Sequence, residues 1–83
     1  MADKSLYTNI VSVTTDYLGP AAQRFIDRQI QNHLDKEPEH LRARDLPILI
    51  DWIRVSIAFL TEDRHLIDEL TSRLRQLERE VKT

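Results

Sequence analysis

The stretch that decides the fold is LPILIDWIRVSIAFL, residues 46–60. At about 100° per residue along an α-helix, its apolar side chains fall on two roughly opposite faces. The first face consists of Leu46, Leu49, Ile50, Ile53, Ile57 and Leu60. The second face consists of Ile48, Trp52, Val55 and Phe59. A helix that is apolar on two sides must be covered on two sides, so we expect it to be the central element.

Glycine and proline delimit the two helices that precede this stretch. Gly19 followed by Pro20 predicts the end of one helix and the start of the next, because glycine tolerates the left-handed conformation and proline suits a first helical position. We expect the first helix to run from Asp3 or Ser5 to Tyr17, and the second from Pro20 to Leu34. Residues 35–44 are predicted to form an ordered connector, with one turn at Pro38 that tucks Leu41 inward.

Capping residues place the two last helices. Asp45 is the expected N-cap of the central helix, and Thr61 that of a fourth helix. The fourth helix carries an apolar heptad pattern formed by Ile67, Leu70, Leu74, Leu77 and Val81. Spacings of three or four residues predict surface ion pairs within helices, namely Asp51 with Arg54, Arg64 with Asp68 and Glu69 with Arg73.

These patterns predict an all-α fold, with residues 1–83 forming one bundle of three to four helices and the end of the last helix extending past the core. A chain of 83 residues buries too little surface to cover two apolar faces easily, and it has no cysteine for a disulfide. We therefore expect a homodimer. The residues expected at the partner interface are Ile48, Trp52, Val55 and Phe59, with Leu70, Leu74 and Leu77 contributing.

Charge and composition bear on the class of partner. Twelve basic residues are scattered among fourteen acidic ones, and the net charge is −2, so a basic surface for nucleic acid is not expected. A histone-like helical dimer that binds nucleic acid remains an alternative. The longest uncharged apolar run, residues 46–50, is far shorter than the roughly 18 residues of a membrane span. We expect a cytoplasmic protein without a membrane partner.

His33 is the residue around which catalysis could be built. With His40 and the acidic residues of the connector it could offer ligands to a divalent metal, and with Lys36 it has the H-x-x-K spacing found around phosphorylatable histidines. However, His33 ends its predicted helix, and Glu37 stands where phosphotransfer domains have a small glycine. One glycine and no cysteine leave no phosphate loop or thiol nucleophile. We therefore expect a protein without catalytic activity, cofactor or metal. The alternative is a histidine phosphotransfer or metal-dependent activity centred on His33.

The segment Tyr17-Leu18-Gly19-Pro20-Ala21-Ala22, followed by Phe25-Ile26 and Arg28-Gln29, resembles the entry to a small helical domain appended to bacterial serine/threonine kinases and other signalling proteins. The likeness covers about a sixth of the chain. It implies a bacterial signalling or regulatory setting and a role in contacts between proteins. Together with the two-faced helix, it predicts a non-catalytic protein-protein interaction or oligomerisation module.

Overall fold

The computed structural model describes residues 4–82. Their α-helices are α1 (Lys4–Leu18), α2 (Ala22–His33), α3 (Leu46–Leu60) and α4 (Arg64–Lys82). Short 3-10 turns occupy Gly19–Ala21, Pro38–His40 and Ala43–Asp45. Helix accounts for 88% of the structure, and the described range contains no strand. The predicted all-α class and a count of four α-helices are thus confirmed for this part of the chain.

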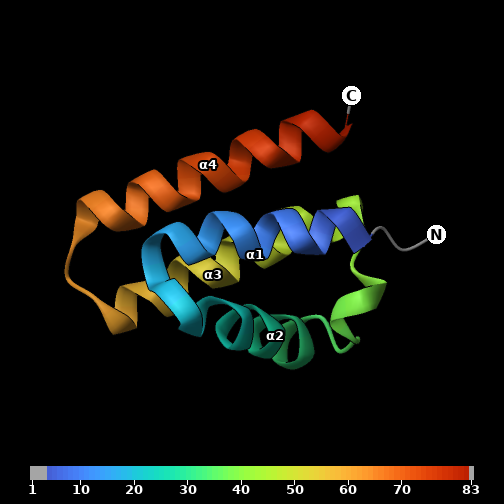
Figure 1. Ribbon diagram of the computed structural model, residues 1–83, viewed down its shortest axis with the longest axis horizontal. Coiled ribbons are helices and arrows are strands. Elements are labelled where there is room, and N and C mark those ends of the chain that lie inside the picture. The colour runs from blue at the N-terminus through green and yellow to red at the C-terminus, as the bar shows by residue number, and fades with distance from the viewer. Residues whose placement is uncertain (1–3, 83) are drawn as a thin grey trace.

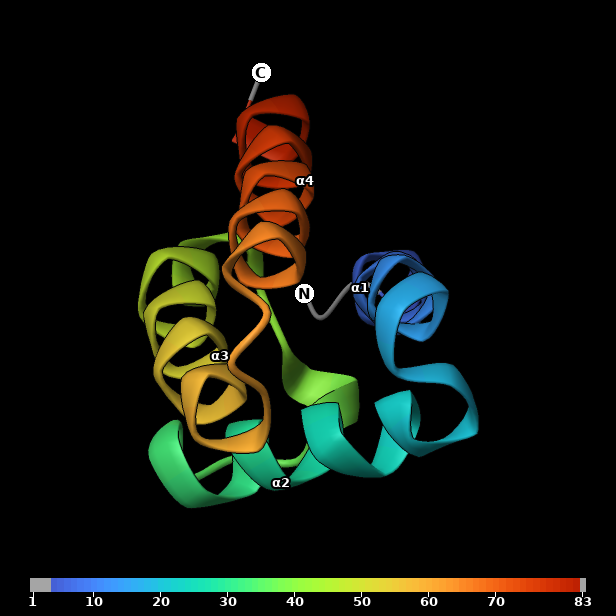
Figure 2. The ribbon, with the colours of Figure 1, turned by 90° about the vertical axis from the view of Figure 1, so that its left-hand side faces the viewer.

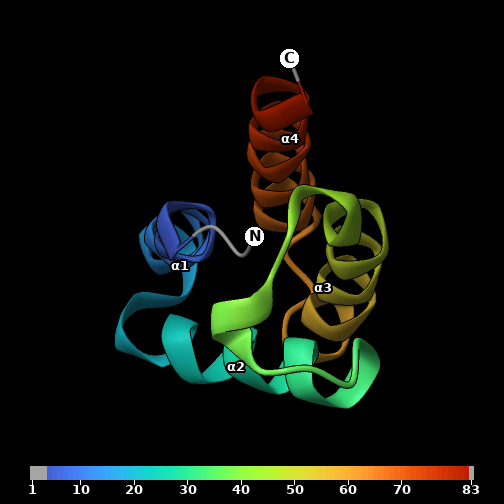
Figure 3. The same cartoon turned by 90° about the vertical axis from the view of Figure 1, so that its right-hand side faces the viewer.

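The four α-helices form a bundle in which three helices lie side by side and the fourth crosses beneath two of them. α1, α3 and α4 run along the long axis of the molecule, and α2 passes beneath α1 and α3 (Figures 1, 2 and 3). α4 lies over the gap between α1 and α3, and these three helices enclose the core with α2 (Figure 2). α3 therefore forms one side of the single chain's bundle, and its outer side, away from α1, is not covered by any of the described helices. The expectation that it is the central element, covered on two sides, is wrong for the single chain, because α1, α2 and α4 all pack toward its first face.

One apolar core is shared by all four helices and the connector. Leu41 of the connector is fully buried beside the turn at Pro38, as predicted. The core residues of the helices are Leu6, Ile10, Ile26, Ile30, Leu46, Leu49, Ile50, Ile53, Ile57, Ile67, Leu70 and Leu74. Leu77 and Val81 are partly buried against this core, so the apolar side of α4 faces the bundle up to Val81.

The break at Gly19 depends on a left-handed backbone. Gly19 has φ of +64°, which ends α1 and lets the chain turn into α2. Pro20 begins the short 3-10 turn, and α2 itself starts at Ala22. The predicted break is confirmed, with the start of the second helix two residues later than expected, within the usual uncertainty of helix ends.

Replacing Gly19 with alanine should lower the free energy of unfolding by about 1–2 kcal/mol, because an L-residue with a Cβ is strained in the left-handed region. Outside Gly19 and its two chain neighbours, no described heavy atom lies within 4 Å of the position that the new Cβ would take. The cost therefore comes from the Cβ against its own local backbone and not from a clash with packed neighbours. Urea denaturation measures the loss. An unchanged unfolding midpoint would show that the turn can relax out of this conformation.

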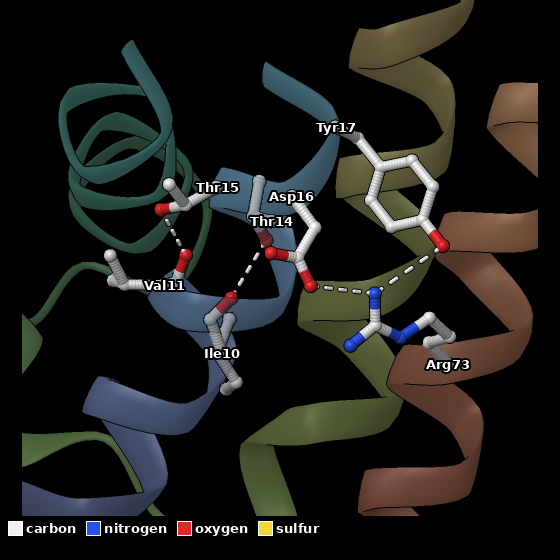
Figure 4. A network of polar contacts seen from close by, with 7 residues as sticks. All are labelled: Ile10, Val11, Thr14, Thr15, Asp16, Tyr17 and Arg73. Atoms are coloured by element: carbon white, nitrogen blue, oxygen red, sulfur yellow. Dashed lines mark hydrogen bonds and ion pairs between the residues drawn. The ribbon is translucent and has the colours of Figure 1, made fainter. Parts of the chain in front are cut away.

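α1 is helical despite its run of β-branched residues. Thr14 is fully buried, and its hydroxyl donates to the carbonyl of Ile10 at 2.8 Å, while the Thr15 hydroxyl donates to Val11 (Figure 4). These bonds satisfy the threonine hydroxyls within the helix. On the same helix, Asp16 accepts a hydrogen bond at 2.8 Å from Arg73, which reaches across from α4.

The helix starts differ in part from the predictions. The N-cap of α4 is Asp63, whose carboxylate accepts the Leu66 N–H at 3.1 Å, and Thr61 instead accepts the N–H of Asp63. Asp45 makes no capping bond to α3. Its carboxylate binds Lys36 at 2.8 Å and the Arg42 N–H at 2.9 Å, and so it ties the connector to the start of α3. At the first helix, Ser5 falls inside α1 and Asp3 lies outside the described residues.

Candidate protein-interaction surface

The second apolar face of α3 lies on the surface of the molecule. Ile48, Trp52, Val55 and Phe59, which we call the α3 stripe, are 53%, 40%, 47% and 86% exposed. They follow one another at steps of four, three and four residues, so they form one line about 16 Å long at 1.5 Å per residue. The described helices therefore leave this line at the surface.

The opposite face of α3 explains why the stripe points outward. Leu49, Ile50, Ile53 and Ile57 are at most 1% exposed and are fixed in the core. Rotating α3 to hide the stripe would expose these side chains, which would cost more apolar burial than it gained. The α3 stripe is therefore held at the surface by the packing of the rest of the helix.

A histidine of α2 packs on the ring of Trp52. The ring of His33, the last residue of α2, stacks on the indole with centroids 3.8 Å apart and planes 4° from parallel. The His33 side chain is exposed, and its ring widens the stripe near its centre. Sequence patterns missed this contact because it joins residues 19 positions apart.

Replacing His33 with alanine should uncover one face of the indole without changing helicity. Trp52 is the only tryptophan in the chain, so the rise in acrylamide quenching of its fluorescence can be assigned to this site. His65→Ala is the matched control, since His65 is exposed on α4 and pairs with Glu69. Equal quenching of both variants would contradict the stacked arrangement.

Leu60 departs from the predicted first face. The spacing places it with the core residues of α3, but it is 66% exposed. α3 ends at Leu60, and there the helix borders an open hollow of about 400 Å³ between α2 and α3. Leu18, Phe25 and Ser56 share the lining of this hollow. Leu60 thus adds to the apolar surface at the Phe59 end of the stripe.

Ion pairs fix the edge of α3 that faces α4. Asp51 accepts a hydrogen bond from Arg75 at 2.6 Å, and Arg54 binds Asp68 at 3.1 Å. The predicted pairing of Asp51 with Arg54 is wrong, because both side chains reach α4 instead. Burial acts to lower the pKa of Arg75, but its hydrogen bonds to Asp51 and Glu78 outweigh this and raise the pKa.

The predicted pairs along α4 are also replaced by other partners. Asp68, expected to pair with Arg64, binds Arg54 of α3. Arg73, expected to pair with Glu69, binds Asp16 of α1 at 2.8 Å and lies over the ring of Tyr17 (Figure 4). Glu69 is paired with His65 at 3.3 Å. The charges of α4 therefore attach it to both neighbouring helices.

The leucines of α4 pack toward the core, whereas the α3 stripe lies on the surface. Leu70 and Leu74 are 0% and 1% exposed, and Leu77 is partly buried against the same core. A partner could not touch Leu70 or Leu74 unless α4 left the bundle. The expectation that these two residues contribute to a partner interface is therefore corrected: they hold the single chain together.

The alternative sites around His33 are not assembled as ligand clusters. His33 ends α2 with its ring on Trp52, and the nearby connector carboxylates and His40 are exposed. Among the described residues, no group of three or more histidine, aspartate or glutamate side chains is placed to hold a metal ion. Within the same residues, no helix has the length and hydrophobicity that a membrane span requires.

No protein-family model, curated protein or solved structure matches the chain. The resemblance of residues 17–29 to a bacterial signalling domain accordingly stays a prediction. Among the described residues, the exposed large apolar side chains are those of the α3 stripe and Leu60.

Proposed function

We propose that the chain is a non-catalytic protein-protein interaction or oligomerisation module that binds its partner through the α3 stripe. The observation that carries this proposal is the exposure of four large apolar side chains on one line of one helix. Contiguous exposed apolar surface is typical of sites where another protein binds, whereas isolated apolar residues are ordinary on any surface.

The spacing of the stripe suits a helical partner. Steps of four, three and four residues repeat the pattern by which helices pack side by side, with each side chain entering a space between residues of the facing helix. Trp52 and Phe59 supply the large aromatic anchors that dominate binding energy at protein interfaces. A partner that lays a helix along α3 would bury both aromatic residues at once.

The helix that carries the stripe is also packed into the fold before it binds. One side of α3 is fixed in the core, and the pairs Asp51–Arg75 and Arg54–Asp68 hold the helix to α4. A stripe on a fixed helix loses little conformational freedom on binding, which favours affinity. A bacterial signalling or regulatory setting, inferred from the resemblance of residues 17–29, is consistent with a domain that acts through contacts.

Site-specific photo-crosslinking in the cells that produce the protein tests this proposal. A benzophenone amino acid placed at Val55, which is half exposed at the centre of the stripe, should form a covalent protein adduct in high yield. The same probe at Ser72, exposed on α4, is the matched control and should give at most about a tenth of that yield. Trp52→Asp added to the Val55 probe should remove the adduct.

Two results would overturn the proposed function. One is the absence of any adduct from the Val55 probe in a folded chain, with folding checked by circular dichroism. The other is an equal yield from positions 55 and 72, which would mean that adducts form by random collision. The mass of the adduct is a separate readout, because it reports which protein is bound and not whether the stripe is used.

A further inference from the structure

We propose that the partner of the α3 stripe is a second copy of this chain, with the two α3 helices packed antiparallel about a two-fold axis. This inference rests on the proposed function and names the partner of the same surface. Three properties of the described chain support it: the symmetric spacing of the stripe, the sizes of its side chains, and the charges along the α2 edge of α3.

The spacing of the stripe reads the same in both directions. Steps of four, three and four residues are symmetric about a point between Ile53 and Arg54. When two copies of α3 run antiparallel across a two-fold axis at that point, Ile48 lies opposite Phe59 of the partner, and Trp52 lies opposite Val55 of the partner. Every stripe residue then meets another stripe residue, and the same surface covers itself on both chains.

The side-chain sizes favour this antiparallel pairing over a parallel one. The antiparallel arrangement puts each aromatic residue against a β-branched aliphatic residue, Phe59 against Ile48 and Trp52 against Val55. A parallel two-fold pair would put Phe59 on Phe59 and Trp52 on Trp52, and would leave the smaller side chains facing each other. When large residues face small ones at every position, the two helices can lie at the same distance along the whole interface. Their side chains then interdigitate, which is what close packing requires.

Charges beside the stripe agree with the same orientation. Arg24 and Arg28 border the hollow next to Leu60, at the Phe59 end of the stripe. Asp35 follows two residues after His33, which stacks on Trp52 on the Ile48 side of the centre of the stripe. In an antiparallel two-fold pair, the α2 edge of one α3 faces the α2 edge of the other in reverse order. The two arginines of each chain then lie on the same side of the interface as Asp35 of its partner, and opposite charges on that side favour this encounter.

The surface offered is large enough for a reversible dimer. At the exposed fractions of the stripe and Leu60, these side chains present on the order of 500 Å² per chain, since a single aromatic side chain can bury about 150–250 Å². Two such surfaces amount to roughly 1,000 Å², the lower bound for a specific interface. We therefore expect a dimer with a dissociation constant in the micromolar range and not a permanent one.

Cysteine crosslinking tests the partner and its orientation together, because the natural chain has no cysteine. Ile48→Cys and Phe59→Cys are made as separate chains, both at exposed positions, and are oxidised alone and as an equal mixture. A disulfide requires Cα atoms within about 7 Å. In the antiparallel pair, two copies of position 48 are offset by 11 residues, or about 16 Å along the helix axis.

The mixture of the two variants should form disulfide-linked dimers at least tenfold faster than either variant alone. Ser72→Cys, on the exposed side of α4, is the control and should form none with any partner. Fast crosslinking of Ile48→Cys alone and Phe59→Cys alone would overturn the antiparallel orientation. Equal, slow crosslinking of all samples, or a wild-type chain that stays monomeric, would overturn the second copy as the partner. A Val55 photo-adduct with a different protein would then leave the proposed function standing.

Discussion

Replacing Phe59 with aspartate should raise the dimer dissociation constant at least about 100-fold, or about 2.7 kcal/mol, while the four helices stay folded. Phe59 is 86% exposed in the single chain, so the fold does not depend on it. The proposed dimer contains two copies of Phe59, one from each chain, and both are buried at the interface. An aspartate there would lose that apolar contact and would bring an unpaired carboxylate out of water.

Sedimentation velocity over a dilution series measures this change, and circular dichroism confirms that the variant is helical. Ser72→Asp is the matched control, because it adds the same charge to the exposed side of α4 and should leave the dissociation constant within about twofold of wild type. A Phe59→Asp chain that dimerises like wild type would contradict the proposed interface. A variant that unfolds would show that no stable monomer exists and that folding requires the partner.

Replacing Leu70 with alanine should lower the free energy of unfolding by about 2–5 kcal/mol, because Leu70 is fully buried and its truncation leaves a cavity in the core. For 83 residues the whole stability is about 4–12 kcal/mol, so this one change could remove half of it. Urea denaturation, performed on the Phe59→Asp background so that dimerisation does not contribute, measures the loss.

Leu60→Ala is the matched control for that experiment, since it makes the same chemical change ten residues away. Leu60 is 66% exposed, so its replacement should change the free energy of unfolding by no more than about 0.5 kcal/mol. If Leu60→Ala cost as much as Leu70→Ala, Leu60 would be packed in the core as the sequence pattern predicts, which would contradict its exposure at the end of α3.

The elements of the fold could be predicted from the sequence because their signals are local. Gly19 ends α1 and Pro20 begins the short 3-10 turn before α2 by their own backbone preferences, and Pro38 starts the turn that buries Leu41. The two faces of α3 follow from helical periodicity alone. Each of these features depends on residues no more than about one turn apart in the chain.

The features that could not be predicted depend on how the helices pack against each other. Arg54 and Arg73 find carboxylates on neighbouring helices at 3.1 and 2.8 Å, whereas sequence spacing offers only partners on the same helix. Gln29 is buried, and its side-chain oxygen accepts a hydrogen bond from Ser56 of α3 at 3.0 Å, which offsets the cost of burying it. No local pattern marks such a residue as internal.

One part of the candidate site could be predicted from the sequence, and another part could not. Periodicity placed Ile48, Trp52, Val55 and Phe59 on one face, and the structure shows all four exposed. Whether other helices would cover that face depended on where α1 and α4 dock, which the sequence pattern left open. For the same reason the heptad leucines of α4 were assigned to a partner, although Leu70 and Leu74 are needed to close the core of the single chain.

The mass of the wild-type chain in solution, measured by light scattering across a range of concentrations, tests the central claim that the α3 stripe is covered by a second copy. At high micromolar concentration the mass should be twice the 9.8 kDa of one chain, and it should fall towards the single-chain value on dilution to low micromolar concentration. A well-folded chain of 9.8 kDa at high micromolar concentration would contradict the claim.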